Sequence, residues 1–169
     1  NGVYFFDRML SWWSRYIGID PEWKEPVRLD IKDGKIVKIS GGYEADAIQR
    51  FLTHMEGKVG EGVWKFDTFH FGVHPNAKIS EYECPNPLHK RIIEHAHTSN
   101  LHVHIGSAGA NENYKYYTHI TGDIRNATLK VGDQLVYEDG WLCCLDDPEV
   151  RRVEAKYPNL PGIPERWQR

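Results

Sequence analysis

Three histidine-bearing segments of this chain carry the residue types that most often bind metals in proteins. The segments hold His70 and His74, His102 and His104, and His119 followed by Asp123. Each segment contains or borders a glycine, so the backbone can turn or approach a ligand closely there. Histidines and a carboxylate gathered in this way would form a site of nitrogen and oxygen donors. The sequence therefore predicts metal-dependent chemistry.

The first two segments present their histidines in different ways. Pro75 follows His74 and keeps that residue extended. His102 and His104 are two apart on a predicted strand, so both side chains face the same side. Such a pair binds a metal, or one member supports a ligand or acts as an acid or base. The competing interpretation of each segment is a polar core residue held by backbone hydrogen bonds, although it is less satisfactory for all three segments together.

The available donors are nitrogen and carboxylate oxygen, because the cysteines lack a zinc-binding spacing. They are Cys84, Cys143 and Cys144, and structural zinc is therefore disfavoured. Two histidines and one carboxylate with open positions suit non-haem Fe(II) and oxygen chemistry, and the same donors suit a hydrolytic zinc or manganese ion. An odd cysteine count with two neighbours adjacent also indicates reduced thiols, as expected of a cytoplasmic protein.

Length and charge narrow the class of protein. The 169 residues suit one domain, large enough to bury roughly two-thirds of its unfolded surface. The net charge is -3, with no block of lysine or arginine, which argues against a nucleic-acid partner. No apolar run approaches the roughly 18 residues of a membrane span, so no membrane partner is expected. The first residue is Asn1, and no signal-peptide pattern follows it, so we expect a processed chain or the C-terminal part of a longer one.

Hydrophobic periodicity predicts the elements that must position these residues. Helices are expected over residues 7–17, 44–56 and 86–97, and strands over residues 64–73, 101–105 and 116–120. Two hairpins are expected, over residues 27–40 with a turn at Asp33-Gly34, and over residues 126–142 with turns at Gly132-Asp133 and Asp139-Gly140. This order predicts an α+β fold, with a mixed or antiparallel sheet, hairpins and packed helices.

The same pattern divides the chain into three parts. Residues 1–26 are expected to form an aromatic-rich helix and, from residue 21, a connector, which together suit docking of a partner. Residues 27–146 are expected to form the metal-binding catalytic domain. Residues 147–169 are rich in charge and proline and predict an extended C-terminal tail.

Several short motifs together resemble a known family. They are residues 33–45, His70-Phe-Gly72, His104-Ile-Gly106, residues 119–129 and Asp139-Gly140. This set resembles the C-terminal half of 2,5-dihydroxypyridine 5,6-dioxygenase, a family that is similar in fold to the leucyl aminopeptidase T metallopeptidases. The resemblance extends over residues 27–142. It implies an enzyme that binds one Fe(II) through two histidines and an aspartate and opens a hydroxylated pyridine ring with O2.

The resemblance also implies which residues bind the metal. The first histidine of the family falls on His70, and its His-x-Asp pair begins at His119. Here the chain departs from the family, because Thr121 stands where the aspartate is expected. Asp123 is the substitute carboxylate that we expect, which gives His70, His119 and Asp123 as the predicted metal ligands. His104 is an alternative third nitrogen ligand.

The remaining predicted roles concern protons, substrate and partners. His104 or His74 would act as acid or base, and Arg125 would hold a substrate carboxylate or phenolate. The substrate is expected to be a small aromatic or heteroaromatic compound, used together with O2. Relatives carry an N-terminal domain that completes the active site, so a second chain or N-terminal half, in a homo- or hetero-oligomer, is expected here.

Two other functions remain open at this point. One is a metallo-hydrolase of the aminopeptidase-like branch that uses zinc or manganese, with Glu81 or Glu83 as an additional ligand or base. The other is a non-catalytic subunit that completes the active site of a partner. Thr121, in place of the family aspartate, favours the second of these functions.

Overall fold

The computed structural model describes residues 1–9, 17–20, 22–78, 82–86, 89, 95–106 and 118–166. The chain divides into two compact units. The first unit comprises Asn1–His70 and His102–Ile124, and the second comprises Phe71–Leu101 and Arg125–Arg169. The fold is α+β, as predicted, with mostly antiparallel sheets and packed helices.

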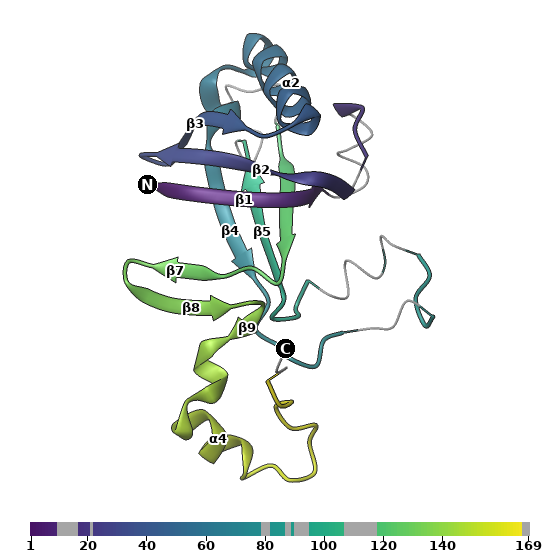
Figure 1. The fold of residues 1–169 in the computed structure, drawn as a ribbon, viewed down its shortest axis with the longest axis vertical. Coiled ribbons are helices and arrows are strands. Elements are labelled where there is room, and N and C mark those ends of the chain that lie inside the picture. Colours follow the sequence, from purple (N-terminus) through teal and green to yellow (C-terminus); the bar gives the residue numbers. More distant parts are fainter. Residues whose placement is uncertain are drawn as a thin grey trace. The chain divides into compact units, whose positions relative to one another are not determined.

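The first unit is built on a six-stranded sheet in the order β3-β2-β1-β6-β5-β4 (Figure 1). Its strands are β1 (Gly2–Met9), β2 (Glu22–Lys32), β3 (Lys35–Ser40), β4 (Phe66–Phe71), β5 (Asn100–Ile105) and β6 (Ile120–Arg125). β1 pairs antiparallel with both β2 and β6. The strand that comes last in the sequence of this sheet, β6, therefore lies in its interior.

The predicted hairpin at Asp33-Gly34 is confirmed. Lys32 pairs with Lys35 across the β2–β3 turn. Asp33 and Gly34 both have positive φ angles, of 50° and 73°, as a two-residue type I′ turn requires. This local turn fixes which residues of β2 and β3 lie opposite each other.

The two edges of the six-stranded sheet meet at one corner. Lys35 of β3 forms an antiparallel bridge with Lys65, the residue before β4. The backbone N–H of Phe66 also donates to the Gly34 carbonyl at 2.8 Å. Since β3 and β4 are the first and last strands of the sheet, these contacts partly close it on itself.

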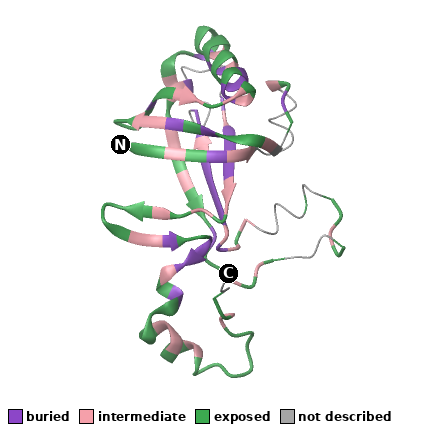
Figure 2. Cartoon of the chain, viewed as in Figure 1, coloured by how far each residue is buried: buried purple, intermediate pink, exposed green. Residues whose placement is uncertain are grey.

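Helix α2 (Tyr43–Val59) covers the apolar face of this sheet. It confirms the helix predicted over residues 44–56, and it buries Ala45, Ala47, Ile48, Leu52 and Val59. These side chains share one core with buried residues of the strands, namely Phe6, Val27, Leu29, Ile36, Val103, Ile105 and Ile120. Burial of each large apolar side chain contributes about 1.5–3 kcal/mol. Figure 2 shows how buried positions follow β5 and β6.

The helix predicted over residues 7–17 is wrong at its start, because residues 7–9 belong to β1. Ile17 is helical, as predicted, and residues 10–16 lie outside the described part. The connector predicted over residues 21–26 is also wrong, since β2 begins at Glu22. Pairing between β1 and β2 overrides the local pattern. Pro26 is accommodated because the β1–β2 register shifts between Phe6 and Arg8, next to the Phe6–Val27 pair.

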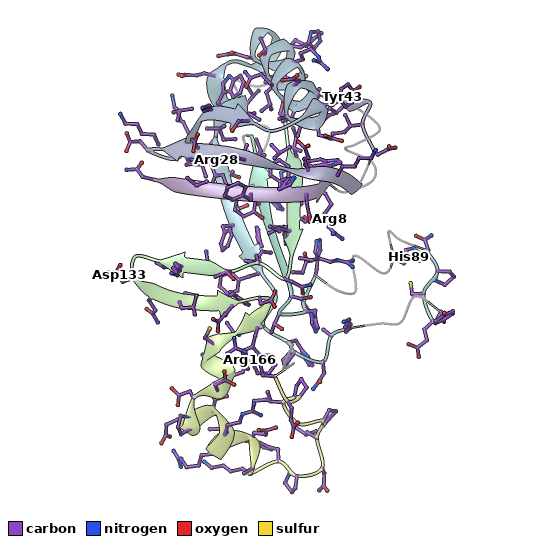
Figure 3. The ribbon with its side chains drawn as sticks, viewed as in Figure 1. Arg8, Arg28, Tyr43, His89, Asp133 and Arg166 are labelled. Carbon is purple, nitrogen blue, oxygen red and sulfur yellow. The ribbon has the colours of Figure 1, made fainter. Side chains whose placement is uncertain are left out.

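The second unit contains a three-stranded antiparallel sheet of β7 (Leu129–Val131), β8 (Gln134–Glu138) and β9 (Trp141–Leu142). It confirms the hairpin and both turns predicted over residues 126–142. A short 3-10 helix, η2 (Cys143–Asp146), follows β9. The predicted extended tail is wrong in part, because it contains helix α4 (Pro148–Glu154), whose first turn is capped by Asp147. Arg166 pairs with Glu138 and so ties the C-terminal segment to β8 (Figure 3).

The elements predicted over residues 86–97 and 116–120 are not found as predicted in the described part of the chain. The helix expected over residues 86–97 lies largely outside the described residues. The strand expected over residues 116–120 is misplaced, because β6 begins at Ile120 and His119 precedes it. Within the described ranges, no helix is long and apolar enough to cross a membrane.

Candidate metal centre

Strand β5 separates apolar and histidine side chains onto its two faces. Val103 and Ile105 are fully buried in the core of the first unit. Successive side chains of a strand point to opposite faces, so His102 and His104 face away from that core. His102 is nevertheless buried, and His104 is half-buried. The predicted strand and the predicted shared face of the two histidines are both confirmed by this arrangement.

Strand β4 brings His70 next to this pair. β4 and β5 are neighbours in the sheet. The imidazole ring of His70 lies parallel to that of His102, with centroids 4.7 Å apart and an angle of 3° between the planes. The rings of His70 and His104 are also 4.7 Å apart, and Nε2 of His70 lies 3.0 Å from Oγ1 of Thr68. Two neighbouring strands thus place three imidazoles together.

These three histidines satisfy the first requirement of a metal site. One ligand atom from each of His70, His102 and His104 lies within 4.8 Å of the others. Metal–imidazole bonds are about 2.0–2.1 Å long, so nitrogens that share one ion lie at most about 4.2 Å apart, and the parallel rings of His70 and His102 would have to turn to bind the same ion. Their donor chemistry suits iron, zinc or copper. The residues that are present therefore fit a metal ion.

His119 flanks this group at the entrance to β6. Its ring lies 4.2 Å from that of His104, at an angle of 62°. Burial lowers the pKa of His119, while nearby Asp67 raises it and His70 lowers it further. Asp67 is itself largely buried and pairs with Lys65 at 2.5 Å. The cluster thus contains four imidazoles within one unit.

Strand β6 contributes a buried carboxylate near the cluster. Ile120 belongs to the apolar core, so Thr121 and Asp123 share the opposite face. Thr121 is only 2% exposed, and Asp123 is fully buried. A carboxylate oxygen of Asp123 lies within 4.8 Å of a ring nitrogen of His102. In the sheet, Asp123 is paired with Arg8 of β1.

The predicted ligands and catalytic residues fall at different places. His70 and His119 both belong to the histidine cluster, and Asp123 lies near His102. His74 and Arg125 belong to the second unit, in which His74 forms a parallel bridge with His97. The metal-binding roles of His70, His119 and Asp123 stay predictions, as do the catalytic roles of His104, His74 and Arg125.

Sequence reasoning considered His102 only as one of a strand pair with His104 and left it out of the predicted metal ligands, yet it belongs to both described groups of candidate ligands. It is near His70 and His104 on one side and near Asp123 on the other. Its alternation with Val103 was visible in the sequence. The order β6-β5-β4, which makes β5 the central strand of the site, was not visible, because strand order depends on contacts distant in the chain.

Comparison with known proteins gives two matches. Residues 16–144 match the family model described as 2,5-dihydroxypyridine 5,6-dioxygenase. The solved structure of a 2,5-dihydroxypyridine dioxygenase from Pseudomonas putida KT2440 is similar with a TM-score of 0.60 and 19% sequence identity, over 83% of this chain. This chain covers 39% of the length of that structure. No curated protein sequence matches significantly.

Proposed function

Because the chain belongs to the 2,5-dihydroxypyridine 5,6-dioxygenase family, we propose that it forms part of a metal-dependent ring-opening dioxygenase. Its substrate would be a small hydroxylated aromatic or heteroaromatic compound, used with O2. The observation that supports this function best is the cluster of His70, His102, His104 and His119 on adjoining segments of one unit. Family membership and the donor chemistry favour Fe(II), with zinc or manganese as alternatives.

The family pattern would place the metal on His70 and His119. Asp123 would be the carboxylate ligand in place of the family's aspartate, whose position holds Thr121 here. An Fe(II) ion bound there would supply redox chemistry between a hydroxylated ring and O2. The protein residues would hold the ring in place and move the proton that its hydroxyl group releases. His104 of the first unit would accept that proton at an imidazole nitrogen. The acid–base role of His74 and the substrate-binding role of Arg125, which belong to the second unit, stay predictions.

The complete active site would need more protein than this chain. The chain spans 39% of the solved relative's length, and a cluster with half-exposed histidines leaves room for other groups to bind. We infer that a second chain, or an N-terminal half of the same protein, covers the cluster and binds part of the substrate. If the completing part is a second chain, the active protein would be a homo- or hetero-oligomer.

Elemental analysis of protein purified without oxygen or chelator tests this function first. About one iron per chain, followed by O2 uptake with hydroxylated pyridines in the presence of the completing partner, is the expected result. Two zinc or manganese ions per chain, with turnover that does not consume O2, would instead identify a metallo-hydrolase. Protein that binds its partner tightly but holds no metal would be a non-catalytic subunit, and the proposed function would then be wrong.

A further inference from the structure

The geometry points to a metal site made of three imidazoles, those of His70, His102 and His104, with Asp123 supporting His102 instead of binding the metal. We propose this assignment in place of the two-histidine, one-carboxylate set. It rests on the proposed function for the presence of a metal, and it refines the ligand set and the class of substrate. His119 would lie beside the site, against His104.

The first argument is the position of the donor atoms. His70, His102 and His104 are a described group whose ligand atoms lie within 4.8 Å of one another and whose members all belong to the first unit. β4 and β5 hold all three on a rigid pair of strands. The strands fix the backbone positions of all three ligands, so only the imidazole rings would have to turn when the metal binds.

The second argument concerns the carboxylate. Thr121 stands where the family motif has its aspartate, and a neutral hydroxyl group is a poor substitute for an anionic ligand. The next carboxylate on that face belongs to Asp123, which is fully buried and lies near a ring nitrogen of His102. A histidine bound to a metal commonly donates its other N–H to a carboxylate, which fixes the ring's tautomer and orientation. Asp123 lies within 4.8 Å of that nitrogen, so a small rotation of the His102 ring on metal binding would bring its N–H within reach of the carboxylate.

The charge of such a site limits its substrates. Three neutral imidazoles leave both positive charges of a divalent ion uncompensated, whereas a carboxylate ligand would cancel one. The preferred ligand is therefore an anion that offers two oxygens. We expect an aromatic compound with an ionised hydroxyl group beside a second oxygen donor to bind much more tightly than a neutral phenol with a single oxygen.

Metal titration without O2 or substrate tests the ligand set separately from the activity. Co(II) is added to the metal-free 169-residue chain, and its dissociation constant is measured for the wild type and for four variants. His70→Ala, His102→Ala and His104→Ala should each weaken binding by more than the roughly 10- to 100-fold expected for loss of a supporting residue. Asp123→Asn should weaken it by only about tenfold. His54→Ala, which removes an exposed histidine of α2, is the matched control and should bind like the wild type.

The number of bound imidazoles gives a second and independent measurement. Electron paramagnetic resonance of the Cu(II)-loaded chain should show three coordinated nitrogens, and two after His70→Ala. His70 is exposed, so this variant is expected to fold even if removal of the buried His102 is not tolerated. Wild-type affinity in His70→Ala and His104→Ala, with loss of binding in Asp123→Asn, would overturn the three-imidazole assignment. If the wild-type protein shows three coordinated nitrogens but no dioxygenase activity, the three-imidazole assignment stands and the proposed function is contradicted instead.

Discussion

The ring of His70 on β4 stacks face to face with the ring of His102 on β5, with 4.7 Å between centroids and 3° between planes. One of the two is exposed and the other is buried. A ring nitrogen of His102 also lies within 4.8 Å of a carboxylate oxygen of the buried Asp123. A ligand that enters from the solvent would meet His70 first, and the orientation of His102 would be set from the inside of the protein.

Gly106 directly follows β5 and allows the backbone of Thr118 to approach closely. A Cβ atom at this position would lie 2.2 Å from the carbonyl oxygen of Thr118, and the φ angle is +99°. Gly106→Ala should therefore destabilise the protein by about 1–3 kcal/mol and weaken Co(II) binding, because it displaces the ends of the strands that hold His104 and His119. Urea denaturation and Co(II) titration measure the two effects.

The control for that change is Gly57→Ala in α2. No atom lies within 4 Å of a Cβ at this position, and alanine favours a helix by roughly 0.5–1 kcal/mol over glycine. This variant should be slightly more stable than the wild type and should bind Co(II) equally well. Equal stability of Gly106→Ala and the wild type would show that the close contact at Thr118 is unimportant.

Thr121→Asp should restore the carboxylate of the family motif. Because Thr121 is buried, an added charge without a metal should cost roughly 3 kcal/mol of stability or more. With Co(II) present, the new ligand should lower the dissociation constant by about tenfold, equivalent to roughly 1.4 kcal/mol. Thr121→Val removes only the hydroxyl group and should leave Co(II) affinity unchanged. An unaltered affinity in Thr121→Asp would mean that this face of β6 does not reach the metal.

Tyr137 of β8 should stabilise the second unit through its hydroxyl group. The fully buried phenol donates to the carbonyl of Gly72 at 2.6 Å. Tyr137→Phe leaves that carbonyl without its donor and should cost about 1–3 kcal/mol, measured by urea denaturation. Tyr43→Phe, at an exposed position of α2, should change stability little and serves as the control.

The same phenol predicts how stability depends on alkaline pH. Burial raises the pKa of Tyr137 well above its ordinary value of about 10. Above that pH the unfolded chain loses the phenolic proton while the folded chain keeps it, so the stability from this group is complete below about pH 10 and falls as pH rises further. The fall should be less steep in Tyr137→Phe. Parallel pH profiles for the wild type and the variant would contradict this account.

The turn at Asp33-Gly34 and the helix around Ile48 could be predicted because their determinants are local. A two-residue turn needs only residues that tolerate positive φ, and a helix shows its buried face every three or four residues. β1 could not be predicted in this way. Its strand conformation depends on pairing with β2 and with β6, for example Arg8 with Asp123, and neither partner is visible in the local pattern.

The candidate site was predictable in part for the same reason. The alternation of His102 and His104 with Val103 placed both histidines on one face. Which other histidines would join them depended on the order of the strands, so the contact between His70 and His102 was not foreseen. The sequence predicted that histidine segments converge, whereas the histidines that lie side by side are seen only in the fold.

The interior position of β6 has a consequence for how the protein folds. β6 lies between β5 and the N-terminal strand β1, to which it is joined through the Met9–Gly122 pair. Pairing between such distant residues is slow to form, because closing a long loop costs entropy before any contact compensates for it. During synthesis, β1 can therefore pair with β6 only after residues beyond 120 have left the ribosome. Since Asp123 belongs to this strand and His119 directly precedes it, the histidine cluster of the first unit can be complete only after β6 has been synthesised.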